Sequence, residues 1–552
     1  MAETITEMII PGTYIEVRAE GLIGVAGVAT GNVGVVGTAA KGPLDEVVIL
    51  SSFADARATF GDYDGWVDGA SSELTLVRAL QQAFANGAST VYAVRTGQAE
   101  AAGLTLADAS GPVLRFVGRT PGTWAREILV SVLEAEDNGF VELRRQEVGA
   151  AALQPLHQRI VASPRNVVRV TRGASGRIVR LALAISGAPA RGRRAVVDPA
   201  TGALTFHADD VPVGGDIVVA SYAVDRAACR RVEVKYRNVV ETYTAIDATD
   251  LKRDVDGAST LLTVAIEAGG EARLPGATPE PLRLDGGDDG ATAGDGDYAS
   301  SLALLDAEPI NLALLAGRGF SEAIGTLKGH VDAAEAAGRD RIAILGADSN
   351  GTDEVAANAD AVAGGRLVLV APGIKVLDLT LGRQVTLPAA YAAAAVAGLI
   401  ASLAVQVSPT NKTLAVAGLA VDYNDGELKK LITSRVLALE KKSGFRVVKG
   451  ISTDDAAFRQ ISVRRIVDYA KAGTRIGSLP YIGKLNNSRV RGALKATLNG
   501  FLADMVLNEA LIGFTLDVTA TREQEIAGTA VVTMSLQPTF SIDFIKVIMN
   551  LS

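Results

Sequence analysis

Few side chains in this sequence of 552 residues could perform catalysis. It contains one cysteine, Cys229, and three histidines, His157, His207 and His330. A Cys–His or Ser–His nucleophile would have to use one of these scattered histidines, and a zinc site of the Cys/His type would have too few ligands. A disulfide within one chain is impossible with a single cysteine. The sequence therefore contains few residues that could catalyse a reaction, and we do not expect an enzyme.

Two other patterns could hold small ligands or ions. Glycines recur between residues 21 and 42, but this segment contains neither G-x-G-x-x-G nor G-x-x-x-x-G-K-[ST], which favours a flexible linker over a phosphate-binding loop. The acidic linker from Asp285 to Asp297 fails the EF-hand register, because position 12 is Gly296 and not a glutamate. We interpret it as an ordered loop between a strand and a helix, and we expect neither a cofactor nor a metal.

The overall charge conceals two basic segments. With 54 basic and 62 acidic residues the net charge is −8. Residues 446–495, named here the C-terminal basic segment, have eleven basic and three acidic residues, a net of +8 that leaves −16 for the remainder. Such segregation favours an interface with a charged partner, with a solvated face as the alternative. We expect no direct contact with nucleic acid.

Residues 164–197, named here the insertion basic segment, contain eight arginines and no acid. They lack the interleaved aromatic side chains that stack on bases, so we interpret them as a solvated face, with contact to a polyanion second. These arginines are Arg165, Arg169, Arg172, Arg177, Arg180, Arg191, Arg193 and Arg194.

One stretch is long enough to span a membrane. Residues 384–411 are uncharged, and about 20 apolar residues suffice to cross a bilayer. Nine alanines lie between Ala389 and Ala404, however, and alanine contributes little to insertion. The pattern favours a buried or interface helix, and we expect no membrane insertion. The first 20 residues are acidic and lack the apolar core of a signal peptide, so we expect a protein that is made inside the cell and does not use the Sec route.

Alternating strands and helices predict the architecture. The fold class is a multidomain α+β or α/β protein, whose parallel-sheet core is interrupted by a β-rich insertion and followed by a mixed α/β domain with terminal β-arms. Hydrophobic periodicity changes near residues 98 and 254 and again near 384. The predicted boundaries are 1–20 for an N-terminal arm, 21–98 with 255–383 for the α/β domain, 99–254 for the insertion, 384–537 for the mixed α/β domain, and 538–552 for a C-terminal arm.

At both ends of the chain, apolar and polar residues alternate as is typical of strands, and neither end has an obvious partner strand within the chain. An unpaired strand is an aggregation hazard unless another chain completes it. We therefore expect these arms to add strands to the sheets of neighbouring subunits. The N-terminal arm residues are Tyr14, Ile15, Glu16 and Val17, and the C-terminal ones are Phe540, Ile542, Phe544, Ile545, Val547 and Ile548.

An ordered set of motifs resembles the contractile phage tail sheath family, which includes the sheaths of R-type pyocins and related injection systems. The motifs are MIIPGTYIEV, NVGVVGTAAKGP, RTPGTWAREILVSV, LRLDGGDDG…DY, SPTNKTL, SGFRVVKGIST, SVRRIVDYAK and FTLDVTATREQEIAGTAVVTMSLQP. They follow the order of the family and cover most of the chain outside the insertion. Many relatives carry a tryptophan in the C-terminal domain, whereas the tryptophans here are Trp66 and Trp124.

This resemblance implies a structural subunit that forms helically stacked hexameric rings around an inner tube and contracts to drive the tube through a target cell envelope. The implied partners are further copies of the chain, the inner tail tube protein, and baseplate and tail terminator proteins. The implied location is a virion tail or an extracellular or cytoplasmic injection particle, whose subunits are synthesised and assembled in the bacterial cytoplasm. The basic residues expected to face the tube are Arg464, Arg465, Lys471, Arg475, Lys484, Arg489, Arg491 and Lys495.

Two other classes of function remain open from the sequence. The parallel-sheet core between Asn311 and Pro372 could bind a nucleotide or another ligand at the carboxyl ends of its strands, as α/β enzymes do. Alternatively, the arms could build a shell or surface polymer that does not contract.

Overall fold

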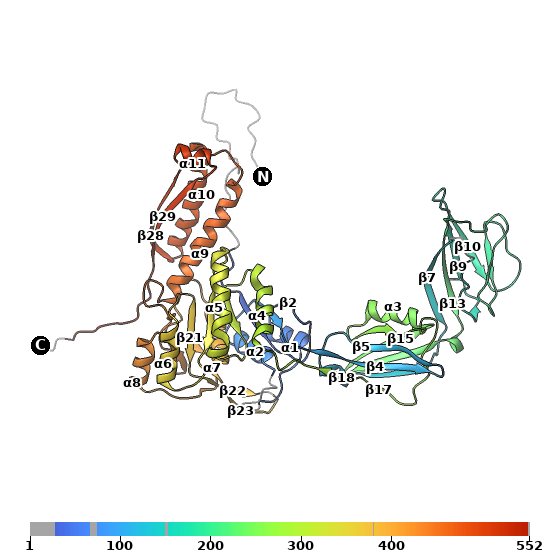
Figure 1. Ribbon diagram of the computed structural model, residues 1–552, viewed down its shortest axis with the longest axis horizontal. Coiled ribbons are helices and arrows are strands. Elements are labelled where there is room, and N and C mark those ends of the chain that lie inside the picture. The colour runs from blue at the N-terminus through green and yellow to red at the C-terminus, as the bar shows by residue number, and fades with distance from the viewer. Residues whose placement is uncertain (1–27, 67–73, 149–152, 379, 550–552) are drawn as a thin grey trace, which may run out of the picture. The chain divides into compact units, whose positions relative to one another are not determined.

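The computed structural model describes residues 28–66, 74–148, 153–378 and 380–549 (Figure 1). The chain divides into two compact units. The first combines the residues up to Gly97 with those from Ala291 onward, and the second is Gln98–Gly290. The two units are described separately below.

A mostly parallel sheet forms the centre of the first unit. Its central strands are apolar on both faces, as expected for a sheet covered on both sides: in β1, Val33 and Val35 enter one core, and Val36 enters the other. In spatial order the strands are β2 (Val47–Leu50), β3 (Val91–Arg95), β1 (Val33–Gly37), β19 (Leu312–Leu315), β20 (Ile342–Gly346), β21 (Leu367–Ala371), β26 (Leu437–Lys441), β27 (Phe445–Val447) and β24 (Thr413–Leu414).

Helices cover both faces of this sheet and complete three layers. One face is covered by α1 (Phe53–Phe60), α2 (Leu76–Ala85) and α7 (Ala389–Ser402). The other is covered by α4 (Asp295–Ala303), α5 (Phe320–Ala336), α6 (Thr352–Ala361) and α8 (Asp425–Thr433). A small sheet of β23 (Arg383–Leu387), β22 (Ile374–Asp378) and β25 (Gly418–Leu419) adjoins the first face.

Helix α7 is the alanine-rich segment that could have been mistaken for a membrane span. Every residue from Ala389 to Ile400 is buried. Small side chains let it lie close to α2: a Cβ placed on Gly398 would be 2.1 Å from the carbonyl oxygen of Ala83. The prediction of a buried helix is confirmed. Among the described helices, none combines the length and hydrophobicity that crossing a membrane requires.

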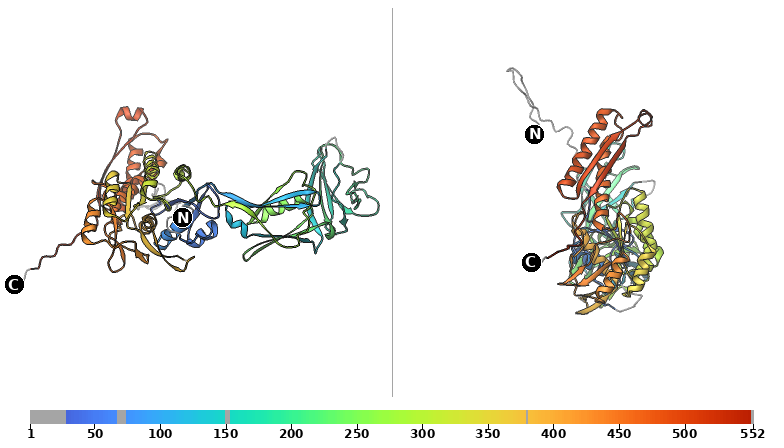
Figure 2. Two further views of the ribbon diagram at one scale, coloured as in Figure 1. Left: turned by 60° about the horizontal axis from the view of Figure 1, so that its bottom comes forward. Right: turned by 90° about the vertical axis from the view of Figure 1, so that its left-hand side faces the viewer.

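The carboxyl-terminal part of the first unit consists of two long helices and a hairpin (Figure 2). The segment NSRVRGALKATLNGFLADMVLNEAL contains α10 (Ser488–Leu507), and Asn487 caps it by accepting a hydrogen bond from the backbone N–H of Val490. The other elements are α9 (Ile461–Ser478), the short helix η4 (Leu479–Tyr481), β28 (Leu511–Thr519), α11 (Arg522–Ile526) and β29 (Val531–Pro538).

The second unit is β-rich, as the alternating pattern predicts. Its first sheet has the order β12 (Leu204–Thr205), β11 (Arg194–Val197), β10 (Ile178–Ala184), β9 (Val167–Thr171), β13 (Ile217–Val224) and β7 (Gly139–Glu147), with β8 (Ile160–Val161) also paired to β13. Two further sheets are β15 (Val239–Ala245), β14 (Arg230–Tyr236), β6 (Leu129–Glu134) and β17 (Leu282–Arg283), and β16 (Leu262–Ile266), β5 (Gly111–Gly118), β4 (Glu100–Asp108) and β18 (Asp285–Asp288). Helices α3 (Ala248–Ala258), η1 (Thr123–Glu127) and η2 (Arg226–Ala228) complete it.

The end of the insertion differs from the predicted residue 254. The apolar run Leu262–Ile266, expected in the parallel sheet, instead pairs antiparallel with β5. Asp285–Asp288, expected in a loop, pairs antiparallel with β4. The insertion therefore continues to Gly290. The prediction was wrong because an apolar run identifies a buried strand without identifying its sheet.

Candidate assembly surfaces

The hairpin of β28 and β29 has one buried face and free edges. Val532, Met534 and Leu536 share the half-buried face, as the alternation predicts, while Thr533 and Ser535 are exposed. This face packs on α10, where Leu494 and Leu498 are buried with Val518. The register runs from Leu511 opposite Pro538 to Thr519 opposite Val531. Within the described chain, β28 and β29 pair only with each other, so each presents an unpaired edge.

The segment after β29, residues 539–549, is the apolar tail predicted as a C-terminal arm. Its described residues form no strand and, as Figure 1 shows, it runs away from the body of the first unit. Phe544 is 85% exposed, Ile545 82% and Ile548 71%. Exposed apolar surface on this scale marks a protein interaction site. The predicted N-terminal arm residues, Tyr14 to Val17, lie outside the described residues.

The first residues of this tail are attached to α9 and to the loop before it. Gln460, which caps α9, accepts a hydrogen bond from the backbone N–H of Ser541 at 3.4 Å. Lys449 forms an ion pair with Asp543 at 3.0 Å and lies 5.1 Å from the ring centroid of Phe544. The tail therefore leaves the body at a fixed position beside the start of α9.

Three of the residues expected to face the tube, Arg464, Lys471 and Arg475, belong to an internal ion network. Arg464 and Arg465 are only 5% and 6% exposed, so they contribute no surface charge, which corrects the prediction for these two. Arg464 pairs with Asp468 at 2.5 Å, one turn along α9. Lys471 and Arg475, also on α9, both pair with Asp340, the latter at 2.7 Å.

Arg366, directly before β21, lies at the centre of this network. It pairs with Asp340 at 2.5 Å, Glu335 at 2.7 Å and Asp468 at 2.9 Å. Hydrogen bonding by Arg366 lowers the pKa of Glu335 to about 2. Burial favours a higher pKa for Asp340, but hydrogen bonds from Lys471 and Arg475 outweigh it and lower that pKa. Helix α9 is thereby bound to the parallel-sheet core through charges.

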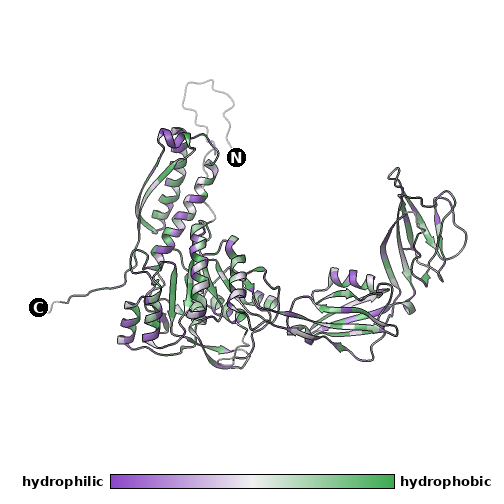
Figure 3. Cartoon of the chain, viewed as in Figure 1, coloured by the Kyte–Doolittle hydropathy of each residue, from purple (hydrophilic) through white to green (hydrophobic). Residues whose placement is uncertain are grey.

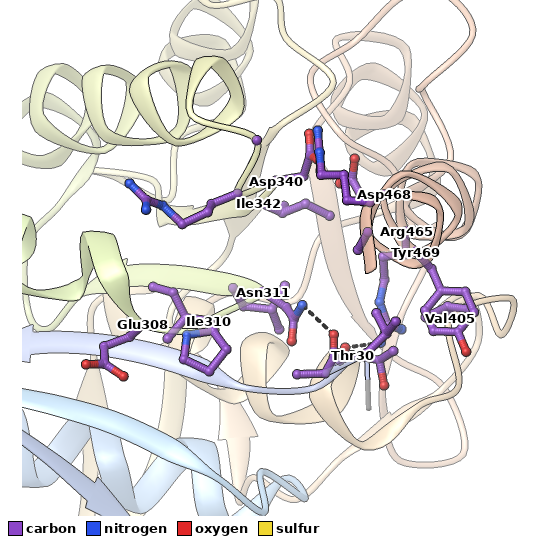
Figure 4. Close-up of a pocket in the computed structure, with 18 of the residues that line it drawn as sticks. Thr30, Glu308, Ile310, Asn311, Asp340, Ile342, Val405, Arg465, Asp468 and Tyr469 are labelled. Atoms are coloured by element: carbon purple, nitrogen blue, oxygen red, sulfur yellow. Dashed lines mark hydrogen bonds and ion pairs between the residues drawn. The ribbon is translucent and has the colours of Figure 1, made fainter. Parts of the chain in front are cut away.

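Arg465 has a different role. Its guanidinium donates to the carbonyl oxygens of Leu403 at 2.9 Å and Ala404 at 3.2 Å. It also donates to the carbonyl oxygen of Thr30 at 2.9 Å, and Figure 4 shows these two residues beside each other. Leu403 is the residue that ends α7, so the cation lies at the negative end of that helix dipole. Burial lowers the pKa of Arg465 to about 10. Asn311, at the start of β19, holds the same segment by donating to the carbonyl oxygen of Ala29 at 2.9 Å.

A cavity of about 340 Å³ adjoins Arg465. Its wall includes Ile310, just before β19, Ile342 from β20, and Asp468 and Tyr469 from α9 (Figure 4). Its lining residues include no histidine, cysteine or serine.

The sequence left open a ligand site at the carboxyl ends of the parallel strands, but side chains fill the crevice there. Between β1 and β19, where the strand order reverses, Thr75 lies against Thr38 and Tyr298, with hydroxyl oxygens 3.2 and 3.4 Å apart. Gly317 has a φ of +71°, and a Cβ there would be 2.4 Å from Thr75 Cγ2 and 3.1 Å from the hydroxyl of Tyr391. Side chains of the chain itself occupy the position at which α/β enzymes hold a ligand.

The remaining predicted basic residues lie near the far end of the two helices. Arg491 pairs with Glu525 at 3.0 Å and Lys495 with Asp517 at 3.1 Å. Lys484 and Arg489 are exposed, and no carboxylate of the described chain forms an ion pair with either. Figure 3 shows the strongly hydrophilic α11 at this end.

The sequence did not point to the apolar residues beside Lys484. Leu479, Ile482 and Leu485 are 66%, 79% and 77% exposed. Their spacing of three residues in LPYIGKL was the available signal. The ion network around Arg366 was also missed. Two of its members, Asp340 and Arg366, stand just before apolar strands, where a charged side chain can remain at the end of a sheet.

Comparison with known families identifies the first unit. Residues 291–453 match the phage tail sheath protein central domain, and residues 453–552 match the phage tail sheath C-terminal domain. Together these matches place a phage tail sheath central domain and a phage tail sheath C-terminal domain in residues 291–552 of this chain. The resemblance noted in the sequence is thereby confirmed, and the chain is a sheath protein of a contractile tail or injection system. In a comparison with curated proteins, none matches.

Solved structures show the same fold. The sheath tail protein of Listeria innocua is 14% identical, with a TM-score of 0.59 over 94% of this chain and 93% of that one. The sheath tail protein of Desulfitobacterium hafniense is 14% identical, with a TM-score of 0.56 over 96% and 100%. The predicted mixed α/β multidomain fold is therefore confirmed as a sheath fold. The family and these structures are of structural proteins and not of enzymes.

Proposed function

We propose that this sheath protein polymerises as helically stacked hexameric rings around an inner tube, and that neighbouring subunits are joined by strand addition. The observation that carries the proposal is the combination of free hairpin edges on β28 and β29 with an apolar tail that runs away from the same unit. An edge strand offers unpaired N–H and C=O groups, and an extended segment of another copy satisfies them. Because arm and edge are different surfaces, the contact propagates from subunit to subunit.

Contraction is proposed to be a change of packing between rigid subunits. The ion network around Arg366 supports this, because it binds α9 to the core and lets both move as one body. The arms keep their contacts while subunits rotate outward. The extended sheath is held by tube and baseplate contacts, and contraction releases it into a packing that buries more surface.

The proposed surface for the inner tube is the end of the helices that carries Lys484 and Arg489, with Arg491 and Lys495 nearby. These cations complement an acidic tube surface, and the exposed Leu479, Ile482 and Leu485 add apolar contact area. A baseplate and a tail terminator complete the assembly, in a phage tail or an injection particle.

Truncation tests the strand-addition proposal. Removal of residues 539–552 takes away the apolar tail and leaves the hairpin, so we expect a folded chain that forms no tubes in negative-stain electron microscopy. A matched pair of point variants refines the test. Val547→Pro removes a backbone donor from the tail, whereas Val547→Thr keeps the donor and the β-branched shape. Val547→Pro is expected to prevent tube formation and Val547→Thr to permit it. Ordered tubes from the truncated chain would contradict the proposal.

A further inference from the structure

One face of the first sheet of the second unit carries arginines on three adjacent strands. Arg169 on β9 lies directly opposite Arg180 on β10. Arg194 on β11 lies opposite Ala182, the next outward residue after Arg180. The residues that alternate with them are buried in the core, so all three arginines are on the outward face; the buried residues are Val168, Val170, Leu181, Leu183, Ala195 and Val197.

The positive charge of Arg169, Arg180 and Arg194, called the arginine row below, is not neutralised by neighbouring carboxylates. The nearby carboxylates are used elsewhere: Glu142 pairs with Arg165 at 3.3 Å, Asp216 with Arg172 at 2.7 Å and Asp209 with Arg191 at 3.2 Å. In the part of the chain that the structure describes, no carboxylate forms an ion pair with a member of the row, and Arg194 Nε is buried without a hydrogen-bond partner.

The row also lowers the stability of the sheet. Like charges directly opposite each other on an antiparallel pair are destabilising, and Arg169 and Arg180 have this arrangement. Residues 139–225, which hold this sheet, contain eleven arginines, no lysine and seven acids. Arginine presents a planar fork that binds phosphate through two parallel hydrogen bonds, whereas lysine acts as a point charge. The residue type and the absence of pairing both fit a phosphate ligand better than a solvated face.

We propose that Arg169, Arg180 and Arg194 form a binding surface for a polyol-phosphate chain, an extended single-stranded phosphodiester polymer without bases. Neighbouring strands are about 4.8 Å apart and diagonal neighbours about 7–8 Å, which suits one flexible chain with a phosphate every ~5–8 Å. The other outward residues of these strands are aliphatic or hydroxylic, such as Thr171, Ile178 and Val196, and the described outward positions of β9, β10 and β11 include no aromatic ring on which a base could stack. Recognition therefore depends on the phosphates alone.

This inference goes beyond the sheath function, because the row lies in the unit that the family models do not cover. The phosphate-binding proposal is tested by a binding measurement, whereas the assembly proposal is tested by tube formation. Failure of either proposal therefore leaves the other unaffected.

The experiment measures fluorescence anisotropy of a labelled oligomer of abasic phosphodiester units with the full-length chain. The variant R169Q/R180Q/R194Q is expected to bind at least tenfold more weakly than the unmodified chain. The control R165Q/R191Q/R237Q removes the same charge from exposed arginines that are already paired, and we expect less than a twofold change. For single strands, log K falls with log salt by about 0.7 per neutralised phosphate, so the slope should flatten by about 2 in the first variant.

A second variant guards against misfolding. R169K/R180K/R194K keeps the charge and removes the planar forks, and it is expected to bind severalfold more weakly than the unmodified chain. Equal binding by the first variant and the control would overturn the proposal, as would undetectable binding at low salt. Binding of oligo(dT) or duplex DNA more than tenfold tighter than the abasic oligomer would also overturn it, because the surface would then read nucleic acid.

Discussion

The C-terminal basic segment and the insertion basic segment place similar side chains in opposite settings. In the C-terminal segment, Arg464 is buried and paired, and Lys471 and Arg475 share the carboxylate of Asp340. In the insertion segment, Arg169 and Arg180 face each other on the outward side of a sheet, with no ion pair to any described carboxylate. Both segments have a net charge of +8, yet the C-terminal one presents fewer free cations than its sequence implies.

This difference shows that local charge counts say little about surface charge. The carboxylates that neutralise α9 come from Glu335 and Asp340, more than 120 residues earlier in the chain, and the fold brings them to the helix. The insertion segment meets its carboxylates on nearby strands and turns, where they are already engaged. A charge excess becomes an interaction surface only where the fold supplies no counter-charge.

The largest expected effect comes from breaking the buried network. Asp340 is 3% exposed at its side chain and contacts Arg366, Lys471 and Arg475, so Asp340→Ala leaves three cations without this partner. We expect a loss of about 3–5 kcal/mol in the free energy of unfolding of the first unit. Urea denaturation in a Trp124→Phe background measures it, because Trp66 then reports on the first unit alone.

The control for this variant lies in the other segment. Glu142 pairs with Arg165 on the surface, where both side chains are more than 60% exposed. Glu142→Ala, followed through Trp124 in a Trp66→Phe background, should cost no more than about 1 kcal/mol. Equal losses for the two variants would remove the distinction between the segments.

An intermediate effect is expected where the C-terminal basic segment does reach the surface. The double variant K484E/R489E reverses two exposed charges, so binding to purified inner tube should weaken about tenfold, or ~1.4 kcal/mol, in co-sedimentation at low salt. The unfolding transition should not move. K441E/K442E reverses two exposed lysines at the β26–β27 turn and should bind the tube as the unmodified chain does. If the two double variants bind equally, the electrostatic contact is refuted.

The smallest effect is a gain in stability in the insertion. Arg180→Thr removes the charge opposite Arg169 and introduces a residue that suits a strand, so the second unit should become more stable by about 0.2–1 kcal/mol. Trp124 fluorescence reports the transition. Arg177→Thr, at the tip of the same hairpin, should change stability less. A destabilised Arg180→Thr variant would mean that another group already compensates the repulsion.

Periodicity and turn chemistry were enough to predict the local elements. The glycines at 173 and 176 between two apolar runs are a turn signal in the sequence; the structure has there the antiparallel pair β9–β10, and Gly176 has the φ of +66° that its turn requires. The buried helix α7 and the capped helix α10 were also predictable. Their signals, a run of alanines and an Asn cap, lie within or next to the helices themselves. The apolar tail was visible in the sequence, and its exposure is confirmed.

Long-range partners were not predictable. Leu262–Ile266 has the composition of a strand in either sheet, and only its pairing with β5 assigns it to the insertion. Arg464 and Arg465 are adjacent in sequence and equally basic, yet one pairs with a carboxylate and the other caps α7. Both roles depend on residues distant in sequence, which one sequence without its fold does not reveal. The tube-facing role of Lys484 and Arg489 stays a prediction.

The contacts of helix α9 have a mechanical consequence. Near its start, Arg465 holds Thr30, where the chain leads into the parallel sheet, and Gln460, the residue before α9, holds Ser541, just after strand β29 of the hairpin. These two anchor points are five residues apart on one helix. A pull on either terminal segment is therefore transmitted to the other along a short path through α9, and it does not load the hydrogen bonds of the parallel sheet. Tension between subunits can thus pass across each copy while its core remains folded.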